Sequence, residues 1–106
     1  MRIYISGPMT GHPNYEMDFA KAEGKLRAAG HDAVNPARLG DIIRTEMDAE
    51  KWLTIDLALL SVCDAIFMMD GWKDSRGANR ELGYALGSGI RVFYEGDPIG
   101  GSADDR

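Results

Sequence analysis

Two acidic side chains, Asp56 and Glu81, lie on segments with helical apolar spacing and are directed toward the apolar side. Asp56 follows Trp52 by four residues, and Glu81 lies three residues after Ala78 and four before Ala85. A carboxylate that points toward an apolar region is costly unless it is used or paired. The spacing therefore marks both acids as candidates for chemistry.

Two carboxylates in different environments suit the cleavage of a glycosidic bond. One attacks or stabilises the oxocarbenium-like carbon, and the other protonates the leaving group or activates water. The alternative is structural, with Glu81 paired to a nearby arginine and Asp56 capping or bridging helices. Composition and spacing alone leave both interpretations open.

Three loop segments could hold the rest of a substrate. Residues 6–11 form a glycine-bearing loop that matches neither the dinucleotide fingerprint nor the P-loop. Ser75 is a good helix N-cap, and a helix N-terminus attracts anions. Trp72 could stack on a base, although packing on its own domain is the stronger alternative. The candidate substrate-binding residues are Tyr4, Ser6, Gly7, Pro8, Met9, Gly11, Trp72, Ser75, Arg76 and Gly77.

Alternating strand and helix patterns must position these residues. Apolar spacing, glycines and prolines predict strands at 2–6, 31–34, 64–69 and 90–94, and helices at 15–29, 49–61 and 76–88, with an irregular or partly helical stretch to about residue 48. This order predicts an α/β fold of the Rossmann or flavodoxin-like kind, an open parallel sheet of four to five strands with helices on both faces. Ligands of such sheets bind beyond the carboxyl ends of the strands. We expect one domain over residues 1–95 and a flexible C-terminal tail over 96–106.

Bulk properties narrow the function classes. A chain of 106 residues that is 44% hydrophobic builds one core. The net charge of −5, without a lysine and arginine block, argues against a nucleic-acid polymer as partner. We expect a cytoplasmic location, because neither a signal peptide nor a membrane-spanning run is present. Cys63 fits a buried core thiol, and the two histidines lack metal-ligand spacing, so neither a metal nor another cofactor is expected.

Several motifs resemble the nucleoside 2-deoxyribosyltransferase superfamily. The resemblance spans residues 2 to about 94, and the overall pattern is similar to a small phage and bacterial branch of that superfamily. Its most specific part is the Glu81-Leu82-Gly83-Tyr84-Ala85 run with Asp56 upstream. The other matching motifs are Tyr4-Ile5-Ser6-Gly7-Pro8, Cys63-Asp64-Ala65 and Gly77.

The resemblance implies roles for particular residues. Glu81 would be the nucleophile that attacks C1′ and forms a glycosyl-enzyme intermediate, and Asp56 would assist the departing base. In the related 2′-deoxynucleoside 5′-phosphate N-hydrolases a serine six places before the nucleophile binds the phosphate, and here that residue is Ser75. The hydrolase loop Gly-Ser-Ile-Arg-Gly has an arginine where this chain has Thr10.

The resemblance therefore implies an N-glycosidase, a hydrolase of nucleotide metabolism, that acts on a (deoxy)nucleoside 5′-monophosphate. The alternatives are a nucleoside 2-deoxyribosyltransferase and a non-catalytic nucleotide-binding or sensing module. It also implies a homodimer or a higher homo-oligomer, because family members place their active sites near subunit contacts.

Overall fold

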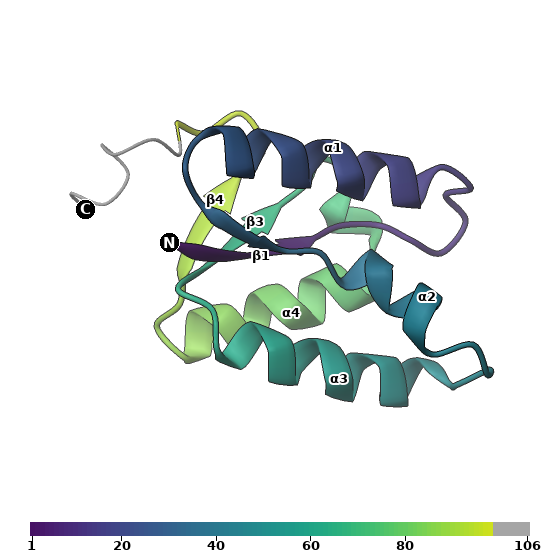
Figure 1. The fold of residues 1–106 in the computed structure, drawn as a ribbon. Coiled ribbons are helices and arrows are strands. Elements are labelled where there is room, and N and C mark those ends of the chain that lie inside the picture. Colours follow the sequence, from purple (N-terminus) through teal and green to yellow (C-terminus); the bar gives the residue numbers. More distant parts are fainter. Residues whose placement is uncertain (99–106) are drawn as a thin grey trace.

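The chain folds into a four-stranded parallel sheet with helices on both faces, as the sequence predicts (Figure 1). The computed structural model describes residues 1–98. The elements in chain order are β1 (Arg2–Ser6), α1 (Tyr15–Ala28), β2 (Asp32–Val34), the 3-10 turn η1 (Pro36–Arg38), α2 (Leu39–Ile42), α3 (Ala49–Ser61), β3 (Ala65–Met68), the 3-10 turn η2 (Trp72–Asp74), α4 (Arg76–Gly87) and β4 (Arg91–Tyr94). The partly helical stretch before residue 48 consists of η1 and α2.

The sheet order is β2-β1-β3-β4, so β1 and β3 are the central strands. All four residues of β3 are buried, which is typical of a parallel strand covered on both faces. On one side of β3, Tyr4 of β1 lies opposite Ile66, and on the other side Tyr94 of β4 lies opposite Met68.

Two apolar layers form the core, one on each face of the sheet. Ile3, Ile5 and Phe67 pack under α1, whereas Tyr4 and Ile66 pack toward α3 and α4 with residues of those helices. Figure 1 shows α1 on one side of the strands and α3 with α4 on the other. Alternation along β1 therefore directs Tyr4 and Ser6 toward the side that carries Asp56 and Glu81.

The helix ends follow the sequence signals. The carboxylate of Asp48 accepts a hydrogen bond from the Lys51 amide at 2.9 Å at the start of α3, and the Ser75 hydroxyl accepts one from the Ala78 amide at 3.2 Å at the start of α4. Gly30, with φ of +91°, follows the end of α1. The N-cap prediction for Ser75 is thus confirmed.

The single cysteine is a core residue, as expected. Cys63 is 7% exposed, and burial raises the pKa of its thiol to about 11.

Within residues 1–98, none of the helices is long and apolar enough to cross a membrane. Most of the predicted tail lies outside the described residues. In its described part, the carboxylate of Asp97 accepts a hydrogen bond from the Tyr94 amide at 2.8 Å just after β4.

A buried acid on α1, Glu23, gives a first prediction about stability. Contacts with Arg38, Asn35 and Arg27 lower its pKa to about 2, so the folded protein favours the ionised form. This stabilisation is present above the unfolded-state pKa near 4.5 and is lost as the pH falls through about 2.

We expect Glu23→Gln to lower the melting temperature at pH 7 by about 4–8 °C, which corresponds to about 1 kcal/mol because its arginine partners are half exposed. Thermal melts between pH 2 and pH 7 check this. The difference from wild type should shrink toward pH 2, and a pH-independent difference would contradict the assignment.

Candidate active site

Two hydroxyl groups on β1 hold the carboxylate of Glu81. Tyr4 donates from its phenol to Oε2 at 2.7 Å, and Ser6 donates from its hydroxyl to Oε1 at 2.6 Å. Tyr4 is 0%, Ser6 1% and Glu81 6% exposed. Each carboxylate oxygen therefore has its own donor in a site shielded from water.

Burial sets the protonation chemistry of this cluster. Burial raises the pKa of Glu81 above its usual value, and the hydrogen bonds from Ser6 and Tyr4, which stabilise the ionised form, offset part of this rise. Burial and the nearby negative charge of Glu81 raise the pKa of Tyr4 well above its usual value. Tyr4 therefore remains a protonated donor, and Glu81 is an oriented carboxylate in a low-dielectric site.

Asp56 is the second acid of the site. It lies on α3, and burial followed by the charge of Glu81 raises its pKa to about 7. The two acids lie on the neighbouring helices α3 and α4, close enough for the charge of Glu81 to affect the pKa of Asp56. Asp56 thus holds its proton up to near-neutral pH, which is the property that a general acid needs in glycosidic chemistry.

Among the described residues 1–98, the arginine partner that the structural alternative assigned to Glu81 is not found. Arg80, the residue before Glu81, pairs with Glu50 on α3 at 2.7 Å. Within residues 1–98, neither Asp56 nor Glu81 takes part in an ion pair with an arginine or lysine.

The loop after β1 lies against the loop after β3. A Cβ on Gly7 would lie 3.0 Å from the Cβ of Met69, a tighter contact than most side chains make, so glycine suits this close approach. The Met69 amide donates to the carbonyl of Ser6 at 2.8 Å, and the ring of Pro8 lies next to Gly71. The carboxyl ends of the two central strands therefore form one edge, where the site lies.

The predicted substrate-binding residues do not all lie together. Tyr4 and Ser6 bond to Glu81 itself. Met9 packs against the core layer on the α1 side, and Gly11 is exposed in the turn that precedes α1. Ser75, Arg76 and Gly77 form the start of α4, one turn before Glu81.

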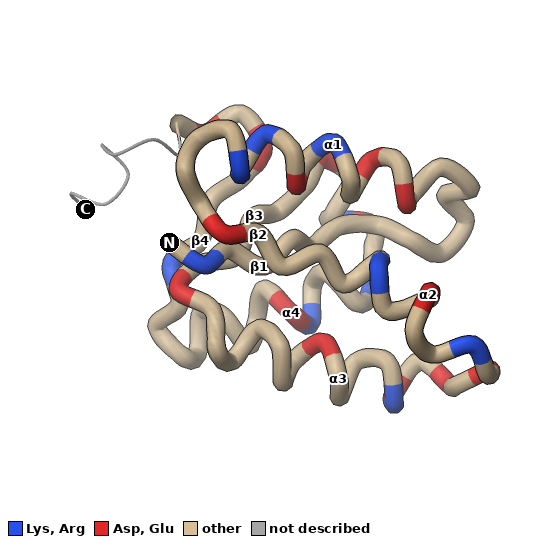
Figure 2. Tube along the Cα trace, in the orientation of Figure 1, with Lys and Arg blue, Asp and Glu red and all other residues tan. Residues whose placement is uncertain are grey.

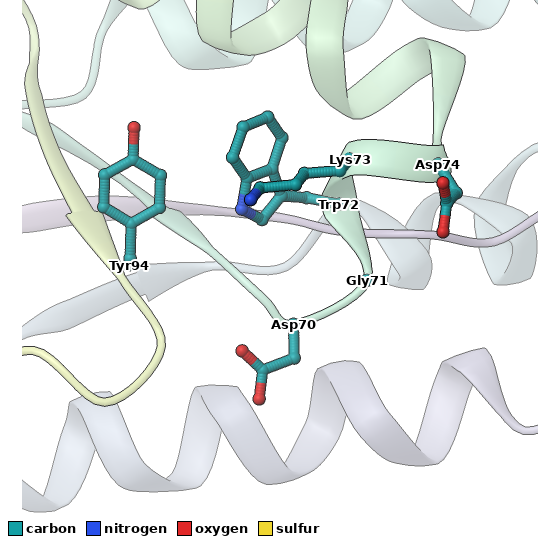
Figure 3. A pocket seen from close by; sticks show the side chains of 6 residues that line it. All are labelled: Asp70, Gly71, Trp72, Lys73, Asp74 and Tyr94. Atoms are coloured by element: carbon teal, nitrogen blue, oxygen red, sulfur yellow. The ribbon is translucent and has the colours of Figure 1, made fainter.

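Trp72 lines a surface pocket together with Tyr94, which was not among the predicted binding residues (Figure 3). Its ring lies 5.7 Å from the ring of Tyr94, and the Lys73 ammonium lies 5.9 Å from the Trp72 ring centre. Asp70, Gly71 and Asp74 complete the lining, which does not include Glu81. Trp72 therefore packs on its own domain, the alternative favoured from sequence. Tyr94 could have been found from its place at the carboxyl end of the last strand.

Residues 1–98 hold no group of three or more histidine, cysteine, aspartate or glutamate side chains that could bind a metal ion.

The family model for the domain of unknown function DUF4406 matches residues 1–94. The chain belongs to the DUF4406 family. This match covers every strand and helix described above. No curated protein matches the chain.

Solved structures relate this DUF4406 protein to 2-deoxyribosyltransferases. The 2-deoxyribosyltransferase of Bacillus psychrosaccharolyticus superposes with a TM-score of 0.68 at 26% sequence identity, over 99% of this chain and 81% of that chain. The 2-desoxiribosyltransferase of Leishmania mexicana superposes with a TM-score of 0.67 at 23% identity, over 88% of this chain and 62% of that chain. The DUF4406 chain therefore has the nucleoside 2-deoxyribosyltransferase-like fold, and the resemblance noted in its motifs is confirmed at the level of the fold.

Proposed function

We propose that this protein is an N-glycosidase that cleaves the base–sugar bond of a (deoxy)nucleoside 5′-monophosphate. The observation that supports the proposal is the buried Glu81 carboxylate, which Tyr4 and Ser6 hold. Asp56, whose pKa is about 7, lies on the neighbouring helix α3. The similarity to 2-deoxyribosyltransferases supports nucleoside chemistry of this class.

The reaction would proceed in two displacements. A carboxylate oxygen of Glu81 attacks C1′, the C1′–N bond breaks, and its electron pair leaves with the base, which takes the proton of Asp56. Water then attacks C1′ and gives its proton to the Asp56 carboxylate, and the bond from C1′ to Glu81 breaks. Transfer differs only in the second step, in which another base replaces water.

The start of α4 is the part of the site that suits a 5′-phosphate. The Ser75 hydroxyl caps the helix, Arg76 adds a positive charge, and the helix N-terminus has a partial positive charge. Gly77 has open space around its Cα position, so the backbone is accessible there. We propose that these three residues bind the phosphate.

A substrate panel tests the proposal. The protein is incubated with nucleosides and with their 5′-monophosphates, and free base is measured by chromatography. Release from the monophosphates alone supports the hydrolase, whereas release from free nucleosides indicates a transferase-like site. If neither set releases base but a nucleotide raises the melting temperature, the protein is a non-catalytic nucleotide-binding module and not an enzyme.

A Ser75→Asp variant tests the phosphate site within the same assay. Aspartate retains the ability to cap the helix but places a negative charge where the phosphate would bind. We expect KM for the monophosphates to rise about tenfold or more, with no change for free nucleosides. An unchanged KM for the monophosphates would exclude Ser75 from phosphate binding.

The protein is also proposed to act as a homodimer or a higher homo-oligomer. Val62 at the end of α3 is 60% exposed and Leu86 on α4 is 63% exposed, and such apolar residues on neighbouring helices suit contact with a second copy. Light scattering decides this, because a monomeric mass at assay concentrations would contradict it.

A nucleic-acid polymer is not an expected partner, and Figure 2 shows acidic and basic positions interspersed along α1. The cytoplasmic location stays a prediction.

A further inference from the structure

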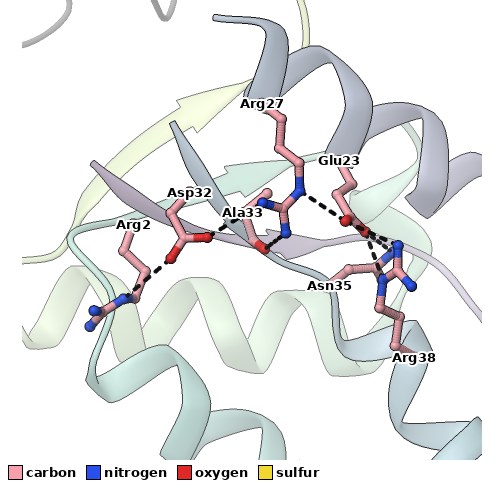
Figure 4. A network of polar contacts seen from close by, with 7 residues as sticks. All are labelled: Arg2, Glu23, Arg27, Asp32, Ala33, Asn35 and Arg38. Carbon is pink, nitrogen blue, oxygen red and sulfur yellow. Dashed lines mark hydrogen bonds and ion pairs between the residues drawn. The ribbon is translucent and has the colours of Figure 1, made fainter. Parts of the chain in front are cut away.

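A second cluster of charged residues lies on the face of the sheet opposite to Glu81 and is centred on Glu23 of α1 (Figure 4). The Arg38 guanidinium donates to both carboxylate oxygens, from Nε to Oε1 at 2.9 Å and from Nη2 to Oε2 at 3.1 Å. Asn35 donates to Oε1 at 3.0 Å, and Arg27 donates from Nε to Oε2 at 3.0 Å. Four donors thus converge on one carboxylate whose side chain is 9% exposed.

The partners of Glu23 hold one short piece of chain, residues 35–38, which we call the β2 arm. Asn35 and Arg38 are its two ends, and both bond to Glu23. Inside it, the Asn35 side-chain oxygen accepts from the Ala37 amide at 2.9 Å. Pro36 and Ala37 are buried. Arg27 also binds the chain just before the arm, through the carbonyl of Ala33 at 3.2 Å. The arm is therefore tied to α1 at both ends.

The β2 arm lies on the flank of the candidate active site. It leaves the carboxyl end of β2, which pairs with β1 through Tyr4 opposite Val34. Val34 packs in the same layer as Tyr4, and Ala37 packs in the same layer as Ile5. The backbone that presents the two hydroxyl donors to Glu81 is therefore supported on this side by a segment that Glu23 fixes.

The β2 arm is also the first part of the connection between β2 and α3, the helix that carries Asp56. Beyond Arg38 the chain continues through α2, where Ile42 is 74% exposed, and reaches the Asp48 cap of α3. Figure 1 shows α2 projecting beyond the strands, on the side where this connection runs toward α3. The anchoring contacts of the connection are thus concentrated in the β2 arm.

We propose that Glu23 is a positioning residue of the Glu81 site, because it fixes the β2 arm that supports Tyr4 and Ser6. The proposal rests on the proposed function for its effect on catalysis. Since a small displacement of catalytic groups is enough to lower the rate, loosening the arm lowers kcat more than it raises KM.

Glu23→Gln tests the proposal, with Glu50→Gln as its matched control. Both variants remove a negative charge from an arginine-paired glutamate, but Glu50 lies on the α3–α4 surface, where its partner is Arg80. For Glu23→Gln we expect kcat for base release to fall about tenfold, with KM within twofold, in protein that still melts cooperatively. Glu50→Gln should retain wild-type kcat.

Hydrogen exchange separates this proposal from the proposed function. In Glu23→Gln the amides of residues 35, 37–42 and β1 should gain more in exchange rate than those of α4 and β4, which should gain only what the loss of global stability gives. If the wild type releases no base, the proposed function is wrong, and the exchange pattern alone then tests whether Glu23 fixes the β2 arm. Unchanged or uniformly faster exchange, or a kcat within twofold of wild type, would overturn the positioning role.

Discussion

Glu81→Gln should abolish base release, with a fall in kcat of at least about 10⁴-fold. Glutamine has nearly the same shape, and its amide oxygen can accept a hydrogen bond from one of the two hydroxyls of Tyr4 and Ser6 while its NH2 group donates to the oxygen of the other. Its amide oxygen is, however, a poor nucleophile toward C1′. The substitution also removes the charge that stabilises an oxocarbenium-like transition state. Single-turnover assays with a substrate from the panel measure the loss.

The variant should remain folded and retain its ligand. A buried carboxylate with a raised pKa is replaced by a neutral group, so the melting temperature should stay the same or rise. Nucleotide binding, followed by thermal shift, should persist. If Glu81→Gln released base at more than about a hundredth of the wild-type rate, Glu81 would not be the nucleophile.

The second large effect concerns Asp56 and the dependence of activity on pH. As general acid Asp56 must be protonated, so kcat/KM should fall as the pH rises through about 7. As nucleophile Glu81 must be ionised, so kcat/KM should rise with pH on the acid side, through a pKa that burial holds above the usual value. The profile is therefore a bell whose alkaline limb belongs to Asp56.

Asp56→Asn should lower kcat/KM by about 10²–10⁴-fold and remove the alkaline limb. The asparagine side chain cannot supply a proton, so the remaining rate should depend most on how readily the base leaves unprotonated. Asp18→Asn, which changes an exposed acid on α1, is the control and should keep the full bell. An alkaline limb that survives in Asp56→Asn would assign the proton to another group.

The arrangement of the elements could be predicted from the sequence because each element has a local signal. Residues 65–69 form a continuous apolar run, and the structure places β3 there with every residue of the strand buried. The apolar spacing around Asp56 and Glu81 also predicts that both acids face the packed side. In each case the signal lies within a few residues along the chain.

The contacts of the site could not be predicted in the same way, because they depend on register between distant segments. Tyr4 and Ser6 were candidates for substrate contact, yet their hydroxyls bond to Glu81, more than seventy positions along the chain. In the sequence, Glu23 is an ordinary acidic residue of an amphipathic helix. Its pairing with Arg38 depends on the position of η1, which the sequence does not indicate. The pairing of Trp72 with Tyr94 likewise appears only once β3 and β4 are aligned.

The most direct test of the central claim is the mass of the enzyme quenched with acid during turnover of a deoxynucleoside 5′-monophosphate. We expect a population heavier by one sugar phosphate, with the added mass on the peptide that contains Glu81 and absent from Glu81→Gln. An adduct on a different residue, or base release by a wild-type enzyme in which no adduct forms at any quench time, would contradict a glycosyl-enzyme intermediate on Glu81.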